Sequence, residues 1–96
     1  MMKKGDKVDV KVRLTKNKKI RPESLHILEN NEYVTIKVSE VIAWKKEYRH
    51  RTAGAFETGS YRYPVVIYYY CCSVVKNKMI YYILKHDMEK CTWHFD

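Results

Sequence analysis

Residues 61–86 read YRYPVVIYYYCCSVVKNKMIYYILKH, and this stretch decides the fold. It holds two runs rich in Tyr, Val and Ile, residues 65–75 and 79–84, which are separated by a short polar segment. A helix is the alternative for short apolar runs, but these residue types favour strands. Because Asn tolerates the left-handed backbone of a tight turn, the stretch predicts one long β-hairpin with Asn77-Lys78 as its two-residue loop.

Strand alternation places the side chains of this hairpin on two faces. We expect the core face to carry Ile67, Tyr69, Cys71, Val75, Ile80, Tyr82 and Leu84. The second face is too apolar for an ordinary solvated sheet face, which indicates a closed barrel, a second layer or a partner chain over it. The candidate interaction face consists of Tyr68, Tyr70, Val74, Tyr81 and Ile83.

Shorter alternating segments surround the hairpin. Residues 8–14 alternate between apolar and charged side chains, and the same period of two recurs in residues 25–27, 33–38 and 91–95. The pair Asn30-Asn31 suits a type I′ turn. The in-facing parity changes after Ser39-Glu40, which indicates a bulge or bend.

The number and spacing of these segments predict the fold class. About six to seven short strands without a convincing helix indicate an all-β fold, namely a small antiparallel β-barrel or barrel-like sandwich. We expect Trp44 and Trp93 to close the ends of its core. The predicted buried residues are Val10, Val12, Ile36, Val38, Ile67, Val75, Ile80 and Leu84.

Length and hydropathy favour one domain that spans residues 1–96, with residues 1–6 as a flexible basic tail. The start has no apolar run typical of a signal peptide, and no stretch approaches the ~20 apolar residues of a membrane helix. We therefore expect a cytoplasmic protein without a membrane partner. Residues 52–60 contain two glycines and form the one long predicted loop, whose role the sequence does not indicate.

Positive charge is concentrated near the start of the chain. Residues 1–21 hold nine Lys or Arg and two Asp, a balance of +7, whereas the whole chain carries +8. Such a cluster is typical of weak, sequence-tolerant contact with nucleic acid backbones, although lysines also simply keep a surface solvated. The candidate nucleic-acid patch consists of Lys7, Lys11, Arg13, Lys16, Lys18, Lys19 and Arg21.

A succession of short motifs runs along most of the chain. They are Val8-Asp9-Val10, Lys19-Ile20-Arg21-Pro22, Leu25-x-Ile27, Tyr33-x-x-x-Lys37-Val38, Gly59 with Arg62-Tyr63, and Trp93-x-Phe95. Together they resemble a family of small bacterial proteins of uncharacterised function. The chain departs from the pattern at Ile27-Leu28, where an aromatic residue is usual, and at Pro64-Val65, where a small polar pair is usual. The resemblance implies a compact β domain in a bacterial cytosol and no particular activity.

Residues that carry chemistry show no catalytic pattern in this sequence. Cys71, Cys72 and Cys91 are an odd number of cysteines, which predicts buried free thiols in a reducing compartment. Cys91 and His94 are one close ligand pair, whereas structural zinc sites usually present two. We therefore expect no catalytic residues, no metal and no other cofactor.

Two hypotheses of function follow, and they belong to different classes. The first is a non-enzymatic protein-interaction or self-associating module, such as a homodimer, that uses the apolar face of the hairpin. The second is a weak, sequence-tolerant binder of single-stranded RNA or DNA that uses the basic patch.

Overall fold

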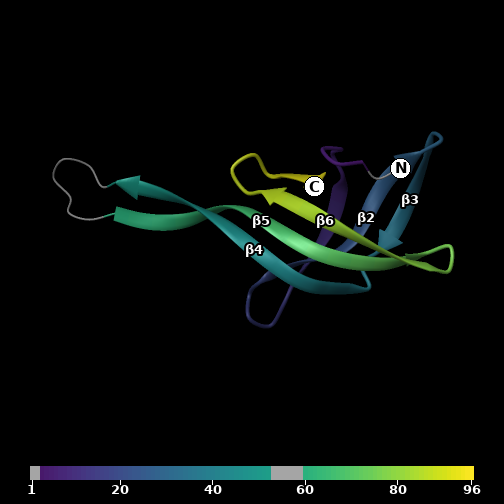
Figure 1. Cartoon of the computed structure of the whole chain (residues 1–96), viewed down its shortest axis with the longest axis horizontal. Coiled ribbons are helices and arrows are strands. Elements are labelled where there is room, and N and C mark those ends of the chain that lie inside the picture. Colours follow the sequence, from purple (N-terminus) through teal and green to yellow (C-terminus); the bar gives the residue numbers. More distant parts are fainter. Residues whose placement is uncertain (1–2, 53–59) are drawn as a thin grey trace.

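The computed structural model describes the backbone of residues 3–52 and 60–96 and the side chains of residues 3–48 and 64–96. Its strands are β1 Asp9–Leu14, β2 Ile20–Glu29, β3 Glu32–Lys37, β4 Glu40–Thr52, β5 Ser60–Val75, β6 Lys78–Asp87 and β7 Thr92–Phe95. They form two antiparallel sheets, of order β1-β2-β3 and β4-β5-β6-β7 (Figure 1). The prediction of an all-β fold with six to seven strands is confirmed. The two sheets are not closed into a barrel.

The hairpin predicted from residues 61–86 is formed by β5 and β6, but its turn lies one residue earlier than expected. Lys76 and Asn77 have φ angles of 51° and 63°, the positive values that a type I′ turn requires at both central residues. Val75 therefore pairs with Lys78 and not with Ile80. The register differs from the prediction by two residues, and an even shift leaves every side chain on its predicted face.

The other predicted turn and bulge are also present. Asn30 and Asn31 have φ angles of 50° and 63° and connect β2 to β3 as a type I′ turn. The predicted irregularity near Ser39-Glu40 lies slightly later, between Val41 and Ala43 of β4. Before this bulge the odd-numbered Val41 faces the other sheet, whereas after it the even-numbered Trp44 and Lys46 do.

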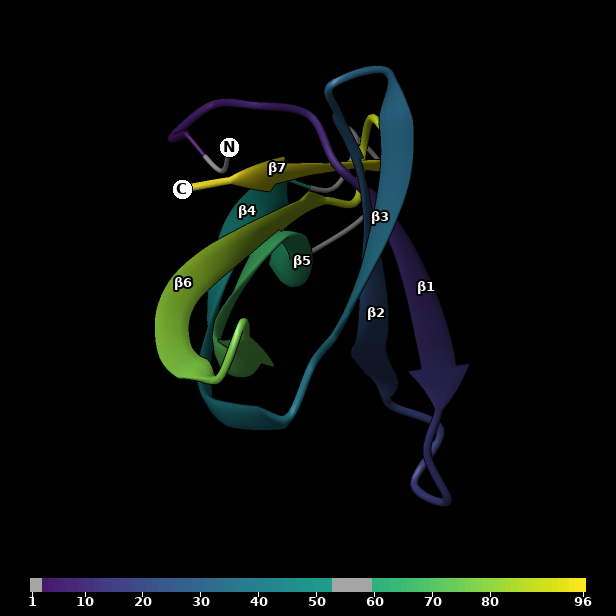
Figure 2. The ribbon, with the colours of Figure 1, turned by 90° about the vertical axis from the view of Figure 1, so that its right-hand side faces the viewer.

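The two sheets are joined along β7. Residues before β1 run beside this strand: Val8 donates its backbone N–H to Trp93, and Phe95 donates to Asp6. An isolated bridge pairs Lys7 with His94. Figure 2 shows that β6 is strongly curved and that β2 and β3 lie on the side toward which it curves.

The core lies between the sheets. It consists of Val8, Leu25, Val38, Ile67, Tyr69, Cys71, Leu84 and Phe95, and Leu25 and Leu84 are fully buried. Ser73 interrupts the apolar run of β5 on this face, and its hydroxyl lies 2.6 Å from that of Tyr82, so neither buried hydroxyl is unpaired. Burial raises the pKa of Tyr82 to about 12.

The predicted core is confirmed for three residues and wrong for one. Val38, Ile67 and Leu84 are buried, and the side chains of Val10, Ile36, Val75 and Ile80 are half-buried. Val12, however, is 42% exposed. A bulge between Lys11 and Val12 ends the regular register of β1 and β2, and the hairpin beyond it extends past the packed centre.

A two-stranded arm projects from the larger sheet. Strand β6 pairs with β5 only from Val66 onward, so the part of β5 before Val66 pairs with β4 alone. Figure 1 shows this arm extending away from the other strands, and the molecule measures 57 × 29 × 18 Å. Residues 53–59, most of the predicted long loop, lie outside the described residues.

Candidate functional site

The solvent side of the larger sheet carries the predicted interaction face. Strand pairing places Tyr70 beside Ile83, Cys72 beside Tyr81 and Val74 beside Met79 on this side. The side chains of Tyr81, Val74 and Met79 are 72%, 56% and 49% exposed. We call this surface the outer face, and it consists of Ile42, Tyr68, Tyr70, Val74, Met79, Tyr81 and Ile83.

The structure thus brings all five predicted residues of the interaction face onto one surface and adds two that sequence reasoning missed. Met79 is 49% exposed and lies opposite Val74. Ile42 is 54% exposed because the bulge of β4 turns it away from the core. The alternation of the hairpin could have identified Met79, but Ile42 depends on the position of the bulge.

Charged residues flank the outer face toward the β4–β5 arm. Lys45 and Lys85 pair with Tyr68 from either side, and Glu47 lies in the next row. Burial and the Glu47 carboxylate raise the pKa of Tyr68. On the side of Tyr68 away from Glu47, the outer face contains a hollow of about 590 Å³. Its lining residues are Ile42, Ala43, Tyr70, Cys71, Tyr81, Tyr82 and Ile83. An apolar centre with charged residues at its margin is the usual anatomy of a protein interface.

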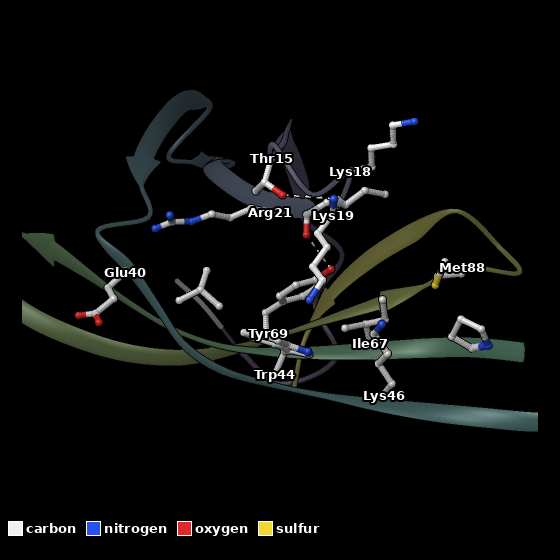
Figure 3. Close-up of a pocket in the computed structure, with 13 residues that line it drawn as sticks. Thr15, Lys18, Lys19, Arg21, Glu40, Trp44, Lys46, Ile67, Tyr69 and Met88 are labelled. Atoms are coloured by element: carbon white, nitrogen blue, oxygen red, sulfur yellow. Dashed lines mark hydrogen bonds between the residues drawn. The ribbon is translucent and has the colours of Figure 1, made fainter.

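A second hollow, of about 560 Å³, lies between the two sheets (Figure 3). We call it the inter-sheet hollow. Val41, Ile67 and Tyr69 form its apolar floor, and the Tyr69 hydroxyl donates a hydrogen bond of 3.2 Å to the carbonyl oxygen of Ile20. The remaining lining residues are Thr15, Lys18, Lys19, Ile20, Arg21, Glu40, Trp44, Lys46, Pro64 and Met88.

The predicted nucleic-acid patch lies only partly at the inter-sheet hollow. Lys18, Lys19 and Arg21 line the inter-sheet hollow. Arg13 lies directly opposite Arg21, and Lys16 belongs to the exposed turn between β1 and β2.

The other two members of the patch do not line the hollow. The ammonium group of Lys11 is 3.9 Å from the Glu23 carboxylate, and Lys7 lies beside His94 of β7. Lys11 is two residues from Arg13 on β1 and so lies on the same side of that strand, whereas Lys7 lies next to β7.

The two tryptophans have different environments. Trp93 packs against the core, with its ring centroid 4.1 Å from that of His86 and 5.5 Å from that of Tyr69. Trp44, in contrast, is 54% exposed at the wall of the inter-sheet hollow, with the Lys19 ammonium 5.4 Å from its ring centroid. The expectation that both close the core is therefore wrong for Trp44. Its environment depends on the bulge of β4 and on the packing of two sheets, which local sequence does not reveal.

Protonation of His86 should destabilise the fold. Burial lowers the pKa of its imidazole below the ordinary value of about 6.5, although the neighbouring Asp87 opposes this effect, and Nδ1 has no hydrogen-bond partner among the described residues. Below about pH 6.5 the unfolded chain therefore binds more protons than the folded chain, and stability falls as the pH falls. Asp87 also has a lowered pKa, but from about 3.8, so it contributes only in more acidic solution.

The measurement is the urea midpoint of unfolding at pH 7.5 and 5.5, compared between the native chain and His86→Phe. The Phe ring can keep the stacking on Trp93 but cannot be protonated, so its midpoint should change less between the two pH values. An identical pH dependence in both proteins would remove His86 as the cause.

The three cysteines differ in exposure. Cys71 and Cys72 are buried, and burial raises the pKa of the Cys71 thiol to about 12. Cys91 is exposed in the turn between β6 and β7, contrary to the expectation for a buried thiol. Since thiolates are the reactive species, we expect a disulfide reagent to modify Cys91 alone in the folded protein and all three after unfolding. Native reactivity that persists in Cys91→Ser would contradict this assignment.

Comparison of the chain with protein-family models, with curated proteins and with solved structures finds no match. Among the described side chains of residues 3–48 and 64–96, no three of His, Cys, Asp or Glu are arranged to hold a metal ion. The same residues contain no helix with the length and hydropathy needed to cross a membrane.

Proposed function

We propose that the protein is a non-enzymatic interaction module that associates with a second copy of itself through the outer face. The observation that carries this proposal is the exposure of Ile42, Tyr70, Val74, Met79 and Tyr81 on one surface. Single exposed apolar side chains are ordinary, whereas a contiguous group of them usually marks a contact surface.

The size of the outer face suits a small symmetric interface. At roughly 200 Å² for a whole large side chain, the exposed fractions of these five residues correspond to roughly 500 Å² of apolar surface. A specific interface covers about 800 Å² on each partner, of which a polar rim forms a part. A two-fold dimer uses the same patch on both copies and is the commonest assembly of soluble chains.

Tyrosine is well suited to such a surface. Its ring supplies a large contact area while its hydroxyl retains a polar partner or water, and interfaces are enriched in it. Binding of single-stranded nucleic acid by the basic patch is the competing proposal. The Glu23 carboxylate beside Lys11 and the position of Lys7 next to His94 favour it less.

Sedimentation equilibrium over a concentration series tests the proposal. The expected mass rises with concentration from 11.6 kDa, the mass of one chain, toward twice this value. A mass of one chain at every concentration up to about 1 mM would contradict self-association. Such a result would place the Kd above about 1 mM, which corresponds to a binding free energy weaker than about −4 kcal/mol.

A further inference from the structure

The inter-sheet hollow has the size and chemistry of a small-molecule site. Its volume is about 560 Å³, and ligand pockets are typically about 300–1,000 Å³ with a mostly apolar lining and a few polar groups. Val41 is one of its apolar lining residues, and Figure 3 shows two others, Trp44 of β4 and Ile67 of β5. The hollow lies on the core side of β5, whereas the outer face lies on its solvent side, so the two sites are separate.

Basic groups outnumber acidic groups in the lining. The lining residues include four basic ones, Lys18, Lys19, Arg21 and Lys46, and one acidic one, Glu40. This is a formal excess of three positive charges around one cavity. A cavity whose walls are low in polarity and whose rim has one sign of charge concentrates ligands of the opposite sign.

The charged and aromatic parts of the site are adjacent. The Lys19 ammonium lies 5.4 Å from the ring centroid of Trp44, and the indole is 54% exposed. A cation over an exposed ring is held weakly. The Lys19 ammonium can therefore move to contact a bound anion while a flat apolar group stacks on the Trp44 ring. A ligand that fits both parts carries a planar ring and a negative group within a few ångströms of each other.

We propose that the inter-sheet hollow binds a free nucleoside di- or triphosphate. The base lies over the apolar floor against Trp44, and the phosphates are bound by Lys18, Lys19 and Arg21 at the turn between β1 and β2. The excess of positive charge in the lining matches a ligand with two or more phosphates. Aromatic stacking recognises the flat face of any base, so we expect little preference among the bases.

A free nucleotide suits the structure better than a nucleic-acid strand. A strand requires basic groups along a continuous track, but Lys7 and Lys11 lie away from the hollow and Lys11 is already beside Glu23. Lys18, Lys19, Arg21 and Lys46 line one hollow, whereas Arg13 and Lys11 continue the basic series along β1 without lining it. An oligonucleotide is therefore the comparison ligand in the experiment.

Calorimetric titration of the full chain with ADP tests the proposal. The test variant is Lys19→Glu, and Lys78→Glu is its control, because both lysines are exposed next to a hairpin turn but only Lys19 lines the hollow. A charge-assisted contact is lost and a repulsion is added in the first variant. We expect the ADP affinity to fall about 10-fold or more in Lys19→Glu and to change by less than about 2-fold in Lys78→Glu.

Ligand fragments separate the two parts of the site. Adenosine, which lacks phosphate, and ribose 5-phosphate, which lacks a base, should each bind about 10-fold or more weakly than ADP. ADP should also quench the fluorescence of Trp44, and the Trp44→Leu variant should lose this signal. Unfolding midpoints of the variants near that of the native chain exclude loss of the fold as the cause.

Three results would overturn the proposal. The first is no heat and no quenching at millimolar ADP. The second is an equal loss of affinity in Lys19→Glu and Lys78→Glu, which would indicate only a general attraction to a basic protein. The third is a single-stranded oligothymidylate that binds more tightly than ADP and competes with it, which would assign the hollow to a nucleic-acid strand.

Discussion

Leu84→Ala is expected to destabilise the folded protein by about 2–5 kcal/mol, the usual effect of a lost leucine side chain together with the cavity it leaves. Leu84 is fully buried on β6, between Tyr69 of β5 and Phe95 of β7. Domains of this size have total stabilities of about 5–15 kcal/mol, so the variant should lose a large part of its stability.

Leu28→Ala is the matched control, because it removes the same atoms from a side chain that is 57% exposed on β2. Its free energy of unfolding should change by about 0.5 kcal/mol or less. Urea unfolding of both variants at one protein concentration measures the difference, since self-association makes stability depend on concentration. Equal losses in the two variants would contradict the assignment of the core.

Tyr81→Glu is expected to weaken self-association by about 100-fold or more, because an interface would bury its carboxylate without a positive partner. Tyr81 is 72% exposed in the single chain and is flanked along β6 by Met79 and Ile83. The fold itself should tolerate Tyr81→Glu, because this position is exposed in the single chain and neither tyrosine nor glutamate has to be buried there.

Tyr33→Glu provides a close control for this variant. Tyr33 is also a strand tyrosine and is 75% exposed, but it lies on β3 in the other sheet. Sedimentation of the two variants at the same concentrations should give single chains for Tyr81→Glu and the native assembly for Tyr33→Glu. The same assembly in both variants would show that the contact lies elsewhere.

Local sequence predicts much of this fold because its strongest signals depend on a few neighbouring residues. Asn30-Asn31 and Asn77 mark tight turns, and the alternation from Ile67 to Leu84 identifies the two faces of the hairpin. The error of two residues in the register of β5 and β6 left these faces unchanged, because side-chain direction repeats every two residues.

The errors arise where a bulge or the packing of distant strands decides the outcome. Val12 alternates with the other apolar residues of β1, but it lies beyond a bulge and is exposed. Trp44 is exposed because of the bulge in β4. The inter-sheet hollow joins Lys19 of the first hairpin to Trp44 of β4 and Ile67 of β5. No spacing along the chain predicts this juxtaposition, since it depends on how two sheets pack.

The most direct test of self-association through the outer face is the relaxation of methyl groups by a soluble paramagnetic probe, measured by NMR at low and high protein concentration. The methyl groups of Ile42 and Val74 are exposed on the outer face, whereas Leu14 and Leu28 are 66% and 57% exposed on the other sheet. If the outer face is the contact, relaxation of Ile42 and Val74 decreases at high concentration while that of Leu14 and Leu28 stays the same. Unchanged relaxation of Ile42 and Val74 in a sample that has associated would contradict the proposal.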